Sequence, residues 1–428
     1  MRRLLTSALL SSVLIASLIL TGCGGRAEGT PSPGTSGQVP AGQGTGPDSS
    51  DPGSAEEPGG STDPGQDPGG SVQEPGGSTG QEPGGNAGSG QEPGTAEPTD
   101  PGQQPTQPAR TMPNPVRGLH LSGWYAGSPD LVWPLLDWAW EAGINTIVLD
   151  LKAEDGYLSW ESNIPLAQEI GANLAKIRDL PAFVAEAHDR GFWVAGRIVV
   201  MNDQWLYKAR PEWAVPGFDG GAYSFMDPAN ENVWAYNIDI AKEAVAAGVD
   251  EIQFDYIRYS EHLRDGYNGK DTTAEYRTGN INNFLRRAME ELKPLGVVVG
   301  ADLFGLTTSV AEGDDMEIGQ DYRAVMEIVD YVAPMVYPSH YANWTYGIEN
   351  PNAAPYDTVY NSMSRALERT QGLPIEKHRP WIQDFSMGGI TYGPSEVMAQ
   401  VQALKDLGIE SFMLWDPSNK YTREVSFR

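Results

Sequence analysis

Apolar and polar side chains alternate most clearly in the stretch Gly248–Ser260, GVDEIQFDYIRYS. Successive side chains of a strand point to opposite faces, so Gln253 and Asp255 share one face while Phe254 and Tyr256 share the other. The glycine at the start of the stretch suits the end of a preceding helix. The pattern therefore predicts a β-strand that follows a helix and carries a carboxylate near its carboxyl end.

Two interpretations of Asp255 follow from this pattern. In a barrel of parallel strands, one face of the strand is the barrel interior, and active sites of (β/α)8 barrels lie at the carboxyl ends of the strands. Asp255 is then a candidate catalytic carboxylate. The alternative is a structural aspartate that pairs with Arg258 or caps a loop, because buried carboxylates are often merely paired.

The same reading along the chain predicts eight strands separated by helices. Strands are expected at Arg117–Ser122, Ile144–Leu151, Phe192–Val200, within Gly248–Ser260, and at Val297–Leu303, Val329–Tyr337, Pro380–Phe385 and Glu410–Trp415. Helices are expected at Asp130–Ala142, Leu180–Arg190, Asn232–Ala247, Ala274–Leu292, Tyr322–Ile328, Tyr356–Arg369 and Pro394–Leu407. This alternation favours parallel pairing with right-handed crossovers, and the count of eight predicts an α/β fold of the (β/α)8 TIM barrel type.

The junctions between helices and strands support this reading, and the end of the chain departs from it. Four helices end at a glycine that leads into a strand, at Gly143, Gly191, Gly248 and Gly408, which suits the left-handed conformation at a helix end. Asp416–Arg428 is too short for a full eighth helix. We expect another segment, such as the one before the first strand, to cover that side of the barrel.

The first residues have the form of an export signal. Met1–Gly22 has two arginines followed by an apolar run that is too short and too early for a spanning helix. It ends in Leu20-Thr21-Gly22-Cys23, which resembles the lipobox of bacterial lipoproteins. Cys23 is the only cysteine of the chain, so an intrachain disulfide is excluded. We predict that Cys23 is lipidated and anchors the protein on the extracytoplasmic face of a bacterial membrane.

Residues 24–115 are predicted to form a tether. They are dominated by Gly, Pro, Ser, Thr and Gln, with recurring phrases such as EPGGS and DPGGS. Such a composition buries too little apolar surface to offset chain entropy. The formal charge of −28 provides no basic surface, which argues against nucleic acid as a partner. The globular domain is therefore expected at 116–428, held away from the membrane, and we expect it to be a monomer.

Polar side chains gather where the predicted strands end, which is the pattern that a catalytic barrel face requires. They are Ser122, Asp150, Lys152, Arg197, Asn202, Asp203, Asp255, Asp302, Tyr337, Ser339, Gln383, Asp384 and Asp416. Aspartate and asparagine also serve as turn and cap residues, so each single position is weaker evidence than the group.

Aromatic residues crowd the same loops. They are Trp124, Tyr125, Trp160, Trp205, Tyr207, Trp213, Trp344, Tyr346 and Trp415. A sugar ring has an apolar face and a hydroxylated edge, which aromatic platforms beside carboxylate, guanidinium and amide groups match. The alternative is that large loops need aromatic cores of their own.

Metal and nucleophile motifs are weak in this chain. The histidines show no zinc spacing, and neither a phosphate-binding glycine loop nor a Gly-x-Ser-x-Gly elbow occurs in the sequence. Asp314, Asp315 and Glu317 offer a calcium alternative, but an exposed acidic loop explains them equally. No cofactor is expected.

From Arg117 to about Asp416 the chain resembles a bacterial family of glycosyl hydrolase domains. The matching segments are RGLHLSGWYAG, INTIVLDLKAEDG, GRIVVMND, MDPANENVW, DEIQFDYIRY, GADLFG, APMVYPSHY, IQDF and MLWDPSN. This family is similar to α-amylase-like barrel glycosidases, in which a strand-four aspartate is the nucleophile and a strand-five carboxylate is the acid/base. The resemblance implies these roles for Asp255 and Asp302.

Together these observations predict a retaining glycoside hydrolase that acts on an extracellular or cell-wall polysaccharide or oligosaccharide. The catalytic candidates are Asp255 and Asp302. The candidates for substrate binding or for orienting the nucleophile are Asp150, Arg197, Gln253, Arg258, Tyr337, Asp384, Trp124 and Trp415. Two alternatives stay open, a non-catalytic barrel that binds cell-wall glycan and a structural protein of the envelope.

Overall fold

The computed structural model describes residues 110–215, 225–260 and 273–428. The export signal, Cys23 and the tether up to residue 109 lie outside these residues. The first described residues already contact the barrel: the guanidinium of Arg110 donates to the carbonyl of Phe192 at 3.2 Å and lies 3.7 Å from the carboxylate of Asp250. The described part of the chain contains no helix whose length and apolar composition suit a membrane crossing.

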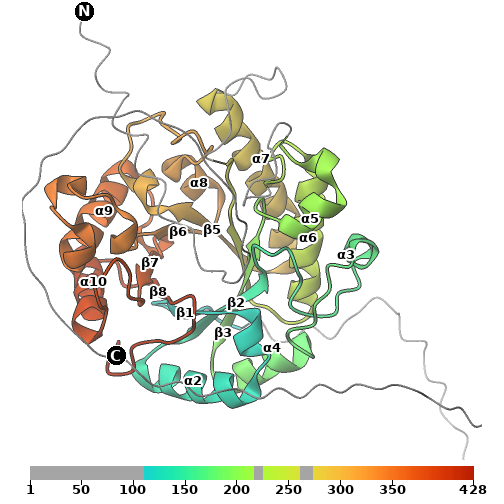
Figure 1. Ribbon diagram of the computed structural model, residues 1–428, viewed down its shortest axis with the longest axis horizontal. Helices are drawn as coiled ribbons and strands as arrows, with labels where there is room; N and C mark the ends of the chain where they lie inside the picture. The colour runs from blue at the N-terminus through green and yellow to red at the C-terminus, as the bar shows by residue number, and fades with distance from the viewer. Residues whose placement is uncertain (1–109, 216–224, 261–272) are drawn as a thin grey trace, which may run out of the picture. The chain divides into compact units, whose positions relative to one another are not determined.

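Eight parallel strands close into a barrel in chain order, with helices around it (Figure 1). The strands are β1 (Arg117–Leu121), β2 (Thr146–Lys152), β3 (Trp193–Val199), β4 (Glu251–Asp255), β5 (Val298–Phe304), β6 (Tyr331–Met335), β7 (Trp381–Gln383) and β8 (Phe412–Trp415). The pairing of β1 with β8 completes the circle. The (β/α)8 fold expected from the sequence is confirmed.

The helices occupy the connections between the strands. They are α1 (Gly123–Ala126), α2 (Pro129–Ala142), α3 (Pro165–Ile170), α4 (Leu180–Asp189), α5 (Gln204–Ala209), α6 (Glu231–Ala246), α7 (Ala274–Leu292), α8 (Tyr322–Ile328), α9 (Pro355–Arg369) and α10 (Pro394–Asp406). Side chains of Asp179, Asn230, Thr273 and Asp321 accept backbone N–H groups at the starts of α4, α6, α7 and α8. The four junction glycines have φ between 77° and 101°, as their predicted role in ending helices requires.

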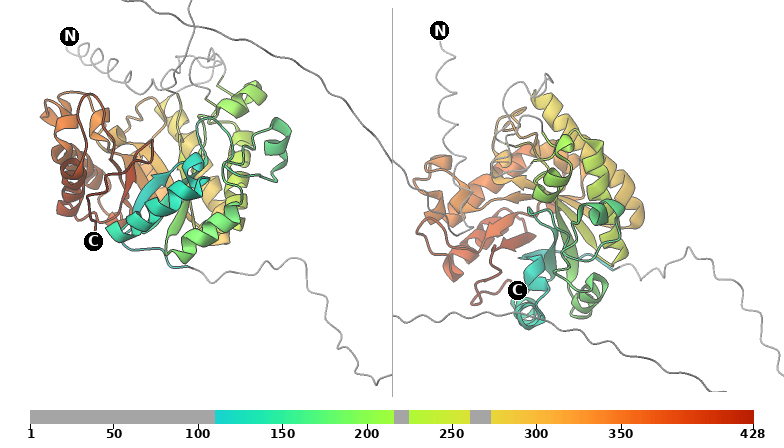
Figure 2. Two further views of the ribbon diagram at one scale, coloured as in Figure 1. Left: turned by 60° about the horizontal axis from the view of Figure 1, so that its bottom comes forward. Right: turned by 45° about the vertical axis from the view of Figure 1, so that its right-hand side comes forward.

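The side that lacks an eighth helix is covered by the C-terminal segment itself, whereas the sequence suggested the segment before β1. Tyr421, Val425 and Phe427 are buried in the main apolar core. The backbone N–H of Phe427 donates to the carbonyl of Ala142 at the end of α2, and its ring packs on Phe412 of β8. The views of Figure 2 agree that the C-terminus lies beside α2. An irregular segment with a few apolar side chains is thus enough to close the barrel.

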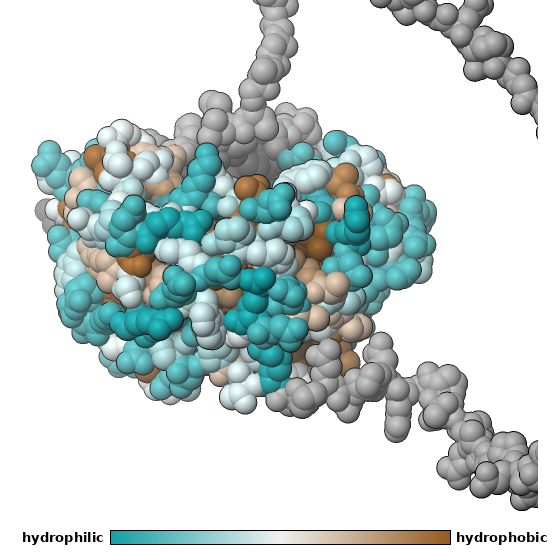
Figure 3. All heavy atoms as spheres, turned by 90° about the horizontal axis from the view of Figure 1, so that it is seen from below, coloured by the Kyte–Doolittle hydropathy of each residue, from teal (hydrophilic) through white to brown (hydrophobic). Residues whose placement is uncertain are grey.

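Apolar side chains form two separate cores. The larger core lies between the strands and the helices, and the smaller one fills the barrel interior with Val148, Ala195, Tyr331, Ala333, Tyr337, Trp381 and Met413. Gly300 makes room for this filling, because a Cβ there would lie 2.0 Å from the ring of Tyr331. The surface seen in Figure 3 is mostly hydrophilic, with apolar residues scattered over it in small groups.

The amino end of the barrel interior is closed by a buried polar cluster. Glu251 is fully buried and accepts hydrogen bonds from Tyr331, from Arg379 at 2.6 Å and from Trp193 at 3.1 Å. All of its neighbours are donors, so the carboxylate is satisfied without solvent. Among the described residues, this cluster fills the amino end of the barrel interior with paired polar groups.

Candidate active site

Four neighbouring strands each place one charged side chain at the carboxyl end of the barrel interior. Asp150 comes from β2, Arg197 from β3, Asp255 from β4 and Asp302 from β5. The register pairs Asp150 of β2 with Arg197 of β3. It also pairs Phe254 of β4 with Ala301 of β5, so the next residues along these two strands, Asp255 and Asp302, stand at the same level. The alternation of a parallel barrel thus brings together side chains that are far apart in the sequence.

Arg197 is the centre of this group. Its Nη1 donates to Asp150 at 2.7 Å, while its Nε and Nη2 donate to Oδ2 of Asp255 at 2.9 and 2.6 Å. Nη2 also donates to Glu154, on the loop after β2, at 2.9 Å. Burial opposes the charge of the guanidinium, but Asp255, Asp150 and Glu154 outweigh burial and raise the pKa of Arg197 well above its usual value.

Asp150 is held ionised between two basic side chains. Nε2 of His120 lies 2.9 Å from its Oδ2, opposite the contact with Arg197. Burial alone raises the pKa of this carboxyl, but His120 and Arg197 outweigh burial and hold the pKa well below its usual value. Asp150 is therefore an anchor for Arg197 rather than a proton donor.

Asp255 is 3% exposed and its two oxygens have different partners. Oδ2 accepts from Arg197, and Oδ1 accepts from the backbone N–H of Tyr256 at 2.6 Å. The alternative partner, Arg258, lies elsewhere: its guanidinium donates to the carbonyl of Tyr259 and packs 4.7 Å from the ring centre of Phe304. The ion pair of Asp255 is thus made across strands, and the pairing with Arg258 considered from the sequence is wrong.

Asp302 has the opposite environment. Its Oδ1 accepts from the indole N–H of Trp381 at 2.9 Å, and its buried Oδ2 has no hydrogen-bond partner among the described residues. Burial, and next the negative charge of Asp255, raise the pKa of Asp302 well above its usual value. The site therefore holds an ion-paired carboxylate beside a carboxyl group whose pKa is raised.

Three aromatic residues were predicted to bind substrate. Tyr337 and Trp415 lie at this site, and Trp124 lies on the surface. Trp415 stacks on His120 with ring centres 4.0 Å apart, and the guanidinium of Arg197 lies 5.1 Å from its ring centre. Tyr337 is 6.4 Å from Trp415. Trp124, in the short helix α1 that follows β1, is 62% exposed, and Nζ of Lys176 lies 5.7 Å from its ring centre.

Of the remaining two predicted residues, Asp384 is hydrogen-bonded within the protein, while the buried Oε1 of Gln253 has no hydrogen-bond partner among the described residues. Gln253 is fully buried, one step below Asp255 on the same face of β4, with its Nε2 3.6 Å from the sulfur of Met413. Asp384, after β7, accepts from the backbone N–H and the hydroxyl of Thr422 in the C-terminal segment. Burial raises the pKa of Asp384 to about 6.

The sequence patterns assigned no role at the site to His120, Glu154 or Trp381, although Glu154 belongs to the polar residues that follow the second strand. His120 follows the alternation of β1, and its inward position beside the end of a strand was a usable signal. Glu154 lies in a loop, and Trp381 looks like any apolar strand residue. The roles of Glu154 and Trp381 depend on which side chains the neighbouring strands present, so no local pattern reveals these two residues.

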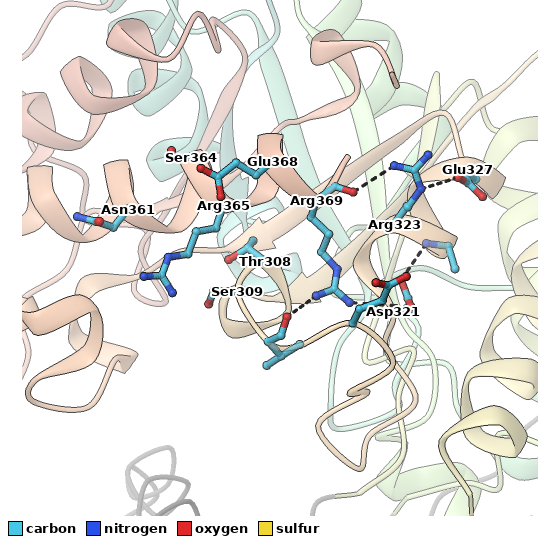
Figure 4. A pocket seen from close by; sticks show the side chains of 13 residues that line it. Thr308, Ser309, Asp321, Arg323, Glu327, Asn361, Ser364, Arg365, Glu368 and Arg369 are labelled. Carbon is cyan, nitrogen blue, oxygen red and sulfur yellow. Dashed lines mark hydrogen bonds and ion pairs between the residues drawn. The ribbon is translucent and has the colours of Figure 1, made fainter. Parts of the chain in front are cut away.

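One pocket lies away from these carboxylates. It has a volume of about 1070 Å³ and lies among α8, α9 and the loop after β5. Figure 4 shows that its charged side chains pair with their surroundings: Arg323 with Glu327 at 3.0 Å, and Arg369 with the carbonyl of Val310. None of the candidate site residues lines it. The candidate site is therefore placed at the charged side chains at the carboxyl end of the barrel interior, and not at this pocket.

Metal ligation has little support in the described ranges. Among the residues that the structure describes, no group of three or more His, Cys, Asp or Glu side chains is arranged to hold an ion. Asp315, one of the three residues of the calcium alternative, accepts two hydrogen bonds of 2.7 Å from Arg277. Its carboxylate is used in an ion pair.

Comparisons with known proteins agree with this geometry. The model of a family described as "Putative glycosyl hydrolase domain" matches residues 118–421. The chain is similar to the glycoside hydrolase domain of PgaB (BpsB) from Bordetella bronchiseptica, with 15% identity over 73% of this chain and 100% of that chain and a TM-score of 0.55. At that identity the likeness concerns the fold alone.

Two further solved structures are similar. The glycoside hydrolase domain of PelA from Pseudomonas aeruginosa is 15% identical over 72% of this chain and 97% of that chain, with a TM-score of 0.43. A hypothetical protein from Ruminiclostridium thermocellum is 39% identical over 43% of this chain and 96% of that chain, with a TM-score of 0.39. Among curated proteins, none matches the chain significantly.

Proposed function

This chain belongs to the glycosyl hydrolase domain family whose model it matches, and we propose that it cleaves glycosidic bonds in a polysaccharide or oligosaccharide with retention of configuration. The observation that carries the proposal is the contrast between two neighbouring carboxyl groups. Asp255 is ion-paired with Arg197, whereas Asp302 has a raised pKa and an unpaired oxygen. A nucleophile and a general acid need this contrast.

In the first step, Asp255 attacks the anomeric carbon and forms a glycosyl-enzyme bond while the bond to the leaving oxygen breaks. Arg197 and the N–H of Tyr256 fix the orientation of the attacking carboxylate. Asp302 gives its proton to the leaving oxygen in the same step. In the second step, ionised Asp302 takes a proton from water, whose oxygen replaces Asp255 on the anomeric carbon.

The spacing of the strands supports retention. Neighbouring strands lie about 4.8 Å apart, and Asp255 and Asp302 stand at the same level on β4 and β5. Retaining glycosidases keep their two carboxyl groups about 5 Å apart, whereas inverting enzymes need a wider gap for water. The level of the two residues therefore favours direct attack by Asp255.

The sugar ring is expected to lie against the aromatic side of the site. Trp415 and Tyr337 present ring surface beside the carboxylates, and Trp124 offers an exposed ring in α1, after β1. Aromatic faces bind the apolar face of a sugar while the charged groups bind its hydroxyls.

The test is release of reducing ends from a panel of bacterial and plant glycans by the soluble domain, residues 110–428. We expect turnover on at least one glycan and none with the Asp255→Asn variant. Binding of a glycan without turnover by the wild-type domain would instead support the carbohydrate-binding alternative. Absence of both binding and turnover across a broad panel would favour a structural role in the envelope.

We also propose that the protein acts on the extracytoplasmic face of a bacterial membrane as a lipid-anchored monomer. The sequence around Cys23 and the Gly/Pro-rich residues 24–109 support this location. Cys23→Ala should release the mature protein from the membrane fraction or block its processing. Unchanged retention of that variant at mature size would contradict the anchor, and a dimer in light scattering would contradict the monomer.

A further inference from the structure

The two oxygens of Asp302 are not equivalent. Oδ1 accepts the indole N–H of Trp381, which is 1% exposed, while Oδ2 is buried and has no hydrogen-bond partner among the described residues. A buried polar atom without a partner costs stability and is rare. Its retention beside an ion-paired carboxylate points to a use in the reaction.

The chemistry of the indole determines where the proton of Asp302 lies. An indole N–H donates and never accepts, so Oδ1 must act as an acceptor. In a neutral carboxyl group the carbonyl oxygen is the better acceptor and the other oxygen carries the hydrogen. We infer that Trp381 is a positioning residue, which fixes the proton of Asp302 on Oδ2, the oxygen that is left for the leaving group of the substrate.

Trp381 is itself held in place by the aromatic side of the site. Its ring meets Trp415 edge to face, with centres 5.4 Å apart and planes at 88°. Trp415 in turn stacks on His120 and lies under the guanidinium of Arg197. The indole therefore cannot turn away from Asp302 without disturbing the ring that also contacts the partner of Asp255.

The other charged groups that face Asp302 set the direction of the effect. Asp255 and Glu251 on β4 raise its pKa, while Arg197 on β3 and the Trp381 hydrogen bond lower it, and burial is the largest cause of the rise. Asp302 in turn acts on Tyr331 of β6, on Tyr337 after β6 and on Arg379 before β7. Loss of the indole N–H therefore raises the pKa of Asp302 further, since that bond favours the charged carboxylate.

This inference rests on the proposed glycosidase function, and the key variant is Trp381→Phe. Turnover should fall about 10-fold to 100-fold for substrates with poor leaving groups and much less for activated aryl glycosides. The alkaline limb of kcat/KM, which reports the general acid, should move upward by about one pH unit. A merely structural tryptophan would lower turnover equally for all leaving groups and leave the limb in place.

Trp193→Phe is the matched control. Trp193 is another buried indole that donates to a carboxylate, Oε2 of Glu251 at 3.1 Å, but at the closed end of the barrel. The same chemical change there should leave both the leaving-group dependence and the alkaline limb as in the wild type. An equal shift in both variants would contradict a specific role of Trp381.

An infrared measurement separates this inference from the proposed function. The C=O stretch of neutral Asp302, assigned by its loss in Asp302→Asn, should move to higher frequency in Trp381→Phe because its hydrogen bond is lost. If Trp381→Phe does not fold, the indole N–H resonance of Trp381 should shift in Asp302→Asn. Full turnover by Asp255→Asn would contradict the proposed function. If Asp255→Asn is inactive but the infrared band is unchanged in Trp381→Phe, or the indole resonance is unchanged in Asp302→Asn, only the role of Trp381 is overturned.

Discussion

Glu154 and Asp255 accept hydrogen bonds from the same nitrogen, Nη2 of Arg197, at 2.9 and 2.6 Å. The two accepting oxygens therefore cannot lie further apart than those distances together, which is about 5.5 Å. The side chain of Glu154 is 37% exposed, while that of Asp255 is 5% exposed. The more exposed carboxylate, Glu154, is thus linked to the proposed nucleophile, Asp255, through the guanidinium group of Arg197.

Glu154→Gln tests whether this exposed carboxylate contacts the substrate. Glutamine keeps an acceptor for Arg197 and removes the charge. Because the pair is partly exposed, the free energy of unfolding should change by less than about 1 kcal/mol. We expect KM to rise several-fold if the charge of Glu154 contacts the substrate. We expect kcat to fall by about tenfold, since Arg197, which orients Asp255, then has one anionic partner fewer.

The control is Glu161→Gln. Glu161 is an exposed carboxylate that also follows β2 in the chain, and it accepts a hydrogen bond from Asn173. Steady-state kinetics and urea unfolding of both variants provide the measurements. Wild-type KM and kcat in Glu154→Gln would show that this residue does not take part.

Arg197→Met should be strongly destabilising. Arg197 is 2% exposed and pairs with Asp150 and Asp255, which are also buried. Removal of the guanidinium strands two buried carboxylates, which costs about 3–5 kcal/mol in the free energy of unfolding. Urea denaturation gives that number directly.

Arg287→Met on α7 is the comparison for this loss. Its partners Glu231 and Glu291 lie on the surface, so the change should cost less than about 1 kcal/mol. Similar costs for both variants would show that the charges around Arg197 are not coupled to folding.

The strands and helices were predictable because their signals are local. Alternation in Gly248–Ser260 and the glycines at helix ends gave the order of the elements, and the number of strands then gave the barrel. Strand boundaries moved by one or two residues, as at β6, which was expected at Val329–Tyr337 and spans Tyr331–Met335. The cover by the C-terminal segment was not predictable, since Phe427 packs on residues that are distant in sequence.

The site was predictable only where one strand carries the whole signal. Asp255 and Asp302 lie on inward faces that alternation reveals. The partner of Asp255 was not predictable, because Arg258 is near in the chain whereas Arg197 is near in space. The indole of Trp381 on β7 reaches Asp302 on β5, past β6, a contact that the pattern of no single strand contains.

Asp255→Asn and Asp302→Asn should lose activity in different ways. The first variant lacks the nucleophile, so turnover should fall by about 10³-fold or more for every substrate while oligosaccharide binding persists. The second lacks the acid, so poor leaving groups should lose about 10²–10⁴-fold and activated ones much less. Kinetics on a series of aryl glycosides distinguish the two patterns. Equal losses across that series in Asp302→Asn would remove Asp302 from the role of general acid.

Asp384 should make the stability of the domain depend on pH. Its pKa is about 6 in the folded protein, above the ordinary 3.8, because burial disfavours the carboxylate. The folded state therefore binds the proton more tightly than the unfolded state. The resulting contribution to stability is complete below about pH 4 and is lost as the pH rises through 6, with a total of about 3 kcal/mol.

The measurement is the difference in unfolding free energy between the wild type and Asp384→Asn from pH 4 to pH 7. Other acidic groups titrate in both proteins and cancel in this difference. We expect the advantage of the wild type to shrink steadily as the pH rises through 6. Thr422→Val should extend that loss to higher pH, because the Thr422 hydroxyl donates to Oδ1 at 2.6 Å and favours the charged carboxylate. A difference that stays constant across this range would mean that the folded and unfolded states bind the proton of Asp384 equally.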